Sequence, residues 1–194
     1  NEIEKIINNE ISNNNLLRIS LTSLKASIEE LPWVRKVLIK IDLPQSILVN
    51  VTEEEAVALW QIKDKFYVLN NEGKIIVEKA SYEDSSLLLI KGDSAQQKLN
   101  EIRDILSLSP EIANKVTAAT LVSKRRWTLH YNDNIYIELP ENKPEVAFKL
   151  LDRVNEKHGL LSHKISSIDL RVKERMVLKL RSKLITNLSS EKGI

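Results

Sequence analysis

The chain has 194 residues, 42% of them hydrophobic and 29% charged, which is the composition of a globular chain that can form its own core. Its formal net charge of +2 excludes a strongly basic nucleic-acid-binding protein, and the absence of cysteine excludes disulfides and thiol chemistry. The sequence has no signal peptide and no apolar run of the roughly 18 residues that a membrane span needs.

The N-terminal part of the chain predicts two helices. Apolar residues recur at helical spacing over residues 2–11 and again over residues 21–31. Ser20 or Thr22 can cap the second helix at its N-terminus. Pro32 ends it, because proline restricts the residue before it and cannot extend the hydrogen-bond ladder. The chain opens at Asn1 in polar sequence without an initiator Met, so we expect the natural N-terminus to lie upstream.

Two strands follow the helices. The apolar period changes to two over residues 34–41 and 46–52, and we expect these strands to pair as a hairpin across residues 42–45. Trp33 comes directly after the proline, where an aromatic ring is expected to be buried between helix and sheet. The first module is therefore predicted to run helix, helix, strand, strand.

After the acidic run Glu53–Glu55 the pattern is mostly that of β-structure. Gly73 falls in a turn where a positive φ is expected. Helices are expected at residues 94–108 and 143–157, the second with Val146, Leu150, Leu151 and Val154 on its apolar face. The expected strands are residues 56–62, 66–69, 74–77, 87–90, 116–122, 127–131, 135–139, 165–170 and 176–180.

The sequence contains no recognisable catalytic or cofactor motif. His130, His158 and His163 have no metal-ligand spacing, and we expect them to be structural or exposed. The four glycines form no phosphate-binding loop, and no serine lies in a nucleophile elbow. These patterns favour a protein that is not an enzyme and has no cofactor.

Two polar segments have alternative interpretations. Lys124–Trp127 mixes basic and aromatic residues, as sites for single-stranded nucleic acid do, but a strand start that faces a partner carboxylate explains it equally well. Asp169 and Arg171 lie two apart on a strand and so point the same way. They form either a surface ion pair or part of a site for a partner.

Several motifs in order resemble the FtsQ/DivIB family of cell-division proteins, most closely its α-proteobacterial branch. The first is Leu-Pro-Trp-Val at residues 31–34, followed by Leu-Pro at 43–44 and Glu-Ala-Val-Ala-Leu-Trp at 55–60. The others are Lys-Arg-Arg-Trp-Thr-Leu at 124–129 and Asp-Leu-Arg at 169–171. Leu43 stands where many members have Trp, the usual Pro near Glu55 is absent, and Val172 replaces a common Tyr near the expected partner surface.

The resemblance implies an α+β fold with two domains. Residues 1–54 would be a small POTRA domain, with helices on a short sheet, whose first strand lies upstream of Asn1. Residues 55–181 would be the β-rich FtsQ-type domain with flanking helices, and residues 182–194 a polar tail. The family's transmembrane helix and cytoplasmic tail would also lie upstream.

The resemblance further implies a non-enzymatic scaffold of the bacterial divisome. It would be a single-pass inner-membrane protein at the division septum, with this region in the periplasm. It would bind FtsB and FtsL, with the POTRA domain as the candidate site for other septal proteins, and link early to late division proteins without binding nucleic acid. The alternative is a POTRA-containing component of outer-membrane protein assembly or secretion.

The expected partner-binding residues combine a terminal strand with nearby cations. In the family, FtsB adds to the end of the β domain as an extra strand. Carried over, the platform begins at Arg175, and basic contacts come from the turn before Trp127 and from the Asp-Leu-Arg motif. Those residues are Lys124, Arg125, Arg171, Arg175, Met176, Val177, Leu178, Lys179 and Leu180. The alternative is that the strand closes the sheet and the cations are solvated.

Overall fold

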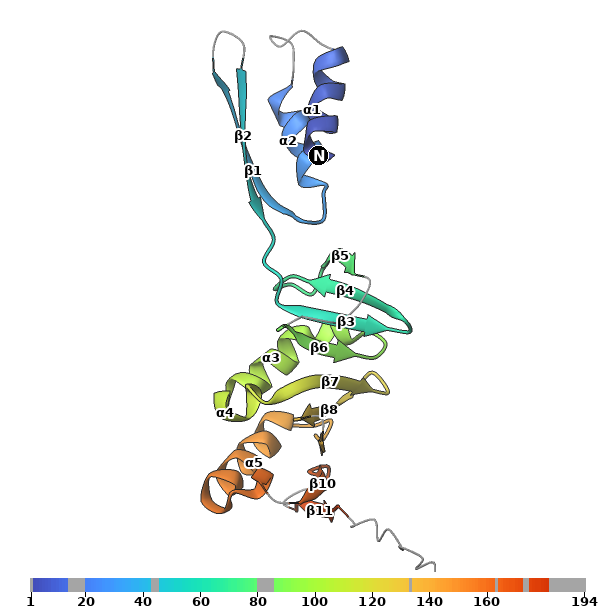
Figure 1. The fold of residues 1–194 in the computed structure, drawn as a ribbon, viewed down its shortest axis with the longest axis vertical. Helices are drawn as coiled ribbons and strands as arrows, with labels where there is room; N and C mark the ends of the chain where they lie inside the picture. The colour runs from blue at the N-terminus through green and yellow to red at the C-terminus, as the bar shows by residue number, and fades with distance from the viewer. Residues whose placement is uncertain are drawn as a thin grey trace, which may run out of the picture. The chain divides into compact units, whose positions relative to one another are not determined.

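The computed structural model describes residues 2–13, 20–42, 46–79, 86–132, 134–162, 164–172 and 175–181. The chain divides into two compact units, Asn1–Asn100 and Glu101–Ile194, which are described separately (Figure 1). The Leu43-Pro44 motif, His163 and the expected tail at 182–194 lie outside the described residues. The domain boundaries expected after residues 54 and 181 stay predictions.

The first unit begins with the predicted helix–helix–strand–strand module. Its elements are α1 (Glu2–Asn13), α2 (Leu21–Glu29), β1 (Val34–Asp42) and β2 (Ser46–Glu53), and β1 pairs antiparallel with β2. The Ser20 hydroxyl accepts a hydrogen bond from the Ser23 amide at 3.2 Å and so caps α2, as expected. The buried residues of the module are Leu24, Ile28, Val34 and Val37, and both helices lie beside the hairpin (Figure 1).

Trp33 differs from the expectation, because it is only partly buried. It packs against the core of Leu24, Ile28 and Val37, and its indole Nε1 donates a hydrogen bond to the Glu2 carboxylate at 3.1 Å. The expected packing against the core is present, but the burial is only partial, because the indole reaches from the apolar core to an exposed polar partner, as amphipathic aromatic side chains do.

Four strands complete the β-structure of the first unit: β3 (Ala58–Ile62), β4 (Lys65–Leu69), β5 (Ile75–Lys79) and β6 (Leu88–Lys91). They lie in the order β6-β3-β4-β5, with β3 and β6 parallel and the other pairs antiparallel. Gly73 has φ +76°, and a Cβ there would collide with the carbonyl oxygen of Gln96, so glycine is required in the turn between β4 and β5.

The second unit contains a mixed sheet and the helices that cover one face of it. The strand order is β11-β10-β9-β8-β7, in which β9 and β10 are parallel and the other pairs antiparallel. Helix α5 connects the two parallel strands. The strands and α5 are β7 (Val116–Val122), β8 (Arg126–Tyr131), β9 (Ile135–Glu138), α5 (Pro144–His158), β10 (Ile165–Asp169) and β11 (Val177–Leu180).

The helices that follow β6 agree only partly with those expected from the sequence. The helix expected at 94–108 is a 3₁₀ turn, η2 (Ala95–Lys98), followed by α3 (Leu99–Ser107). Two short helices, α4 (Pro110–Ala113) and η3 (Leu160–Ser162), were not expected, because one turn leaves no periodic signal. In α5 the fully buried residues are Phe148 and Leu151, whereas Val146 is 55% exposed, so the apolar face expected for this helix is partly wrong.

The two faces of the sheet in the second unit differ in polarity. Trp127, Leu129 and Ile137 are buried on the face toward the helices, and the Trp127 indole Nε1 donates to Glu101 on α3 at 3.1 Å. The alternate residues on the same strands, including Thr128 and Glu138, are only partly buried. The second face therefore carries polar side chains that can meet a partner or solvent.

Candidate partner-binding site

Strand β11 lies at the edge of the sheet in the second unit, next to β10. Among the described residues it pairs with β10 alone. Its four side chains, Val177–Leu180, are all exposed, and Leu180 reaches 70% exposure. A strand with one unpaired edge and exposed apolar side chains can accept an added strand from another chain.

The direction of each amide on β11 follows from one hydrogen bond. The Arg181 amide donates to the Lys164 carbonyl at 2.9 Å, on the β10 side. Amides alternate in direction along a strand, and the pairing shows no bulge within β11, so the amides of Lys179 and Val177 also point toward β10. The amides and carbonyls of Leu178 and Leu180 therefore point outward.

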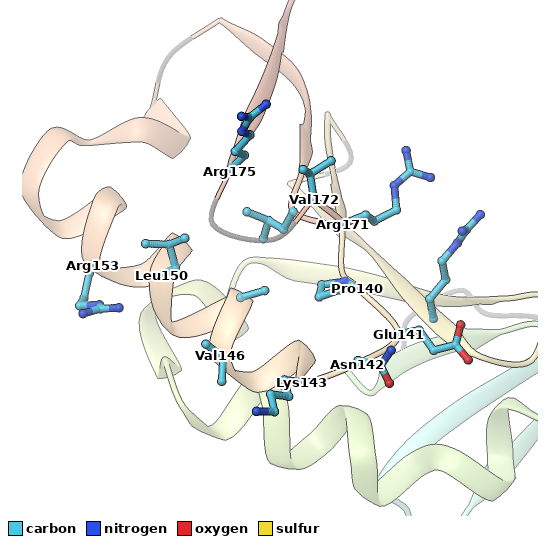
Figure 2. Close-up of a pocket in the computed structure, with 13 residues that line it drawn as sticks. Pro140, Glu141, Asn142, Lys143, Val146, Leu150, Arg153, Arg171, Val172 and Arg175 are labelled. Carbon is cyan, nitrogen blue, oxygen red and sulfur yellow. The ribbon is translucent and has the colours of Figure 1, made fainter.

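A pocket of about 870 Å³ lies between α5 and the segment that follows β10. Figure 2 shows Val146, Leu150 and Arg153 in succession along α5, with Val172 and Arg175 beside them on the other segment. Val146, Leu150 and Arg153 are four and three residues apart, which places them on one face of the helix. The partial exposure of the α5 apolar stripe is therefore explained, because part of that stripe lines the pocket.

The pocket combines apolar walls with cationic side chains. Its apolar wall residues include Pro140, Val146, Leu150, Leu170 and Val172. Its cations are Arg126, Lys143, Arg153, Arg171 and Arg175, and the lining includes one carboxylate, Glu141. The Glu141 carboxylate pairs with Arg125 at 3.2 Å, which leaves the lining strongly positive. Such a surface suits a partner segment that carries both apolar and acidic side chains.

Arg171 is held by two carboxylates of its own chain. Its Nε and Nη2 atoms donate to Asp169 at 2.8 and 2.6 Å, and Nη2 also lies 2.8 Å from a carboxylate oxygen of Glu138. The hydrogen bond from the Arg171 side chain lowers the pKa of the Asp169 carboxyl, and the same bond raises the pKa of Arg171. The ion pair, which is one of the two alternatives for Asp169 and Arg171, is present, and Glu138 is an additional member that the sequence does not indicate.

The residues expected to bind a partner fall into three groups. Arg171 and Arg175 line the pocket, and Arg125 reaches its rim through Glu141. Residues 177–180 form the edge strand, preceded by the partly buried Met176. Lys124 is exposed in the turn before β8 and is not among the pocket-lining residues. Their role in partner binding stays a prediction.

Sequence reasoning missed part of the pocket. Lys143 and Arg153 were not expected to contribute, although Arg153 continues the α5 stripe of Val146 and Leu150 one turn further. Arg126 was expected only as part of the Lys124–Trp127 segment. A cation directly after an apolar helical stripe is a signal that could have indicated a binding face. Within the described ranges, no group of three or more histidine, aspartate or glutamate residues could hold a metal ion.

The described helices include none that is long and apolar enough to span a membrane. Two family models match the sequence: "POTRA domain, FtsQ-type" over residues 1–54 and "Cell division protein FtsQ/DivIB, C-terminal" over residues 58–171. Among solved structures, the major extracytoplasmic domain of DivIB from Geobacillus stearothermophilus matches with a TM-score of 0.39 and 10% identity. That match covers 56% of this chain and 97% of the other.

Curated relatives give the same family. The chain is 29% identical over 156 residues to Cell division protein FtsQ of Rickettsia typhi, which covers 80% of this chain and 58% of the relative. It is 30% identical over 165 residues to FtsQ of Rhizobium meliloti, which covers 85% of this chain and 53% of the relative. The chain thus spans just over half the length of these proteins. With both family models matched in order, the chain belongs to the FtsQ/DivIB family of cell-division proteins.

Proposed function

We propose that this chain is the periplasmic part of a non-enzymatic division scaffold whose second unit holds an acidic segment of FtsB. The observation that carries the proposal is the outer edge of β11, with which no other described strand pairs, in the same unit as a pocket with apolar walls and five cations. The edge supplies backbone hydrogen bonds for an added strand. The pocket supplies contacts that select for apolar and acidic side chains.

The wider role follows from the family. The chain would hold FtsL as well as FtsB, and the POTRA module at residues 1–54 would contact other septal proteins. The remainder of the protein would anchor it in the inner membrane at the division septum. Membership of a cell-division family supports this role.

Arg171 provides the sharpest test of the pocket's part in binding. Arg171→Glu is expected to weaken binding of the periplasmic FtsB segment by about 2 kcal/mol or more, because a reversed charge repels the partner carboxylate. Titration calorimetry with the purified chain measures this change, and circular dichroism checks that the fold persists.

Lys115→Glu is the matched control. It reverses one exposed cation of the same unit that is not among the pocket-lining residues, so it should leave the affinity nearly unchanged. Equal affinities for wild type and Arg171→Glu, with unchanged dichroism, would show that the partner binds elsewhere. Equal losses in both variants would mean that only overall charge matters.

A further inference from the structure

We propose that Glu138 sets how readily the site accepts a partner carboxylate, because it competes with that carboxylate for the Arg171 guanidinium. This inference rests on the proposed function and adds a residue that determines specificity to it. The motifs that the sequence shares with the family do not include Glu138. Its role is inferred from the contacts that the fold creates between β9 and the end of β10.

The charge balance around Arg171 is the first step of the argument. One guanidinium faces two carboxylates, those of Asp169 and Glu138, at 2.6 and 2.8 Å from the same Nη2 atom. The three groups together carry a net charge of −1. A partner carboxylate that approaches Arg171 therefore meets repulsion from this cluster, even though the pocket lining as a whole is positive.

The two carboxylates do not hold Arg171 in the same way. Asp169 contacts both Nε and Nη2, and its carboxylate also accepts the Arg171 backbone amide at 2.9 Å. These three hydrogen bonds hold the Arg171 side chain against Asp169, which lies two residues earlier in the chain. Glu138 makes a single contact, at an Nη2 atom that Asp169 already occupies. Glu138 is therefore the contact that an incoming carboxylate can replace, and Asp169 keeps the guanidinium in place.

The backbone of Glu138 is fixed independently of its side chain. Glu138 lies opposite Thr128 on β8 and opposite Asp169 on β10, and its carbonyl accepts the Leu170 amide at 2.9 Å. Glu138→Gln keeps the shape of the side chain and removes only its charge. The variant should therefore fold normally and leave Arg171 paired with Asp169 alone.

The experiment measures the affinity of the periplasmic FtsB segment for wild type, Glu138→Gln and Glu156→Gln. Glu156→Gln is the matched control, because it also removes one negative charge from the same unit, but from an exposed carboxylate on α5 that is not among the pocket-lining residues. Glu138→Gln is expected to tighten binding about three- to fivefold at low salt, with a smaller effect at high salt. Glu156→Gln is expected to stay within about twofold of wild type.

Two further measurements separate competition from a general change in charge. An FtsB segment whose acidic residues are replaced by their amides should bind wild type and Glu138→Gln equally. In an Arg171→Ala background, Glu138→Gln should have no effect, because the group for which it competes is gone.

The inference is overturned if Glu138→Gln and Glu156→Gln shift the affinity equally, or if the Glu138→Gln gain persists without Arg171. If Arg171→Glu weakens binding while Glu138→Gln leaves it unchanged, this inference is overturned but the proposed function is not. A segment that does not bind wild type at all overturns the proposed function and this inference together.

Discussion

Replacing Trp127 with alanine is expected to lower the free energy of unfolding of the second unit by about 3–5 kcal/mol. The side chain is 1% exposed and lies in the layer between the sheet and the helices, among the buried residues of β8 and β9. The change removes a large apolar surface, leaves a cavity, and deletes the Nε1 hydrogen bond to Glu101. Urea unfolding followed by far-UV circular dichroism measures the loss.

Trp127→Phe separates the packing contribution from the hydrogen bond. It keeps an aromatic ring in the core and removes the indole N–H, so it should cost only about 1–2 kcal/mol. If Trp127→Ala stayed within about 1 kcal/mol of wild type, the described core of this unit would be wrong, because such a cost is typical of an ordinary substitution.

A large effect on binding is also expected from proline at Leu178. Its amide points away from β10, so Leu178→Pro removes a donor that only an added strand would use, and the ring blocks close approach. We expect affinity for the FtsB segment to fall at least about tenfold, which corresponds to roughly 1.4 kcal/mol. Stability should change little, because proline is tolerated on the outer edge of a strand.

Leu178→Ala and Val177→Pro are the controls for this variant. Leu178→Ala removes the side chain but keeps the outward amide, so a smaller loss of affinity assigns the remainder to the backbone. Val177→Pro removes an amide that points toward β10 and should destabilise the edge strand itself. Calorimetry of all three variants separates the contribution of the side chain from that of the backbone. Equal affinities for Leu178→Pro and Leu178→Ala would contradict pairing through the backbone.

The first module is the part of the fold that the sequence predicts best. Ser20 caps α2, which ends at Glu29, shortly before Pro32, and the period of two places β1 and β2 within a residue of their observed ends. These signals are local, so one sequence suffices to find them. Trp33 shows the limit of such signals, because its burial depends on a partner, Glu2, that lies 31 residues away.

Only the parts of the candidate site whose residues lie close together in the sequence were predicted. The edge strand and the Asp169–Arg171 pair are visible in the sequence, since each lies within a few neighbouring residues. The pocket wall on α5 was not, because periodicity identifies an apolar face without showing what covers it. The contact between Glu138 and Arg171 depends on the parallel pairing of β9 with β10, which the sequence alone does not specify.

Hydrogen exchange of the β11 amides tests the central claim most directly. In the free chain the outward amides of Leu178 and Leu180 should exchange quickly, whereas those of Val177 and Lys179, directed at β10, should be slower. Addition of the periplasmic FtsB segment is expected to slow exchange at Leu178 and Leu180 selectively, because an added strand accepts both hydrogen bonds. Unchanged exchange at these two amides in the saturated complex would contradict the claim that FtsB extends the sheet at β11.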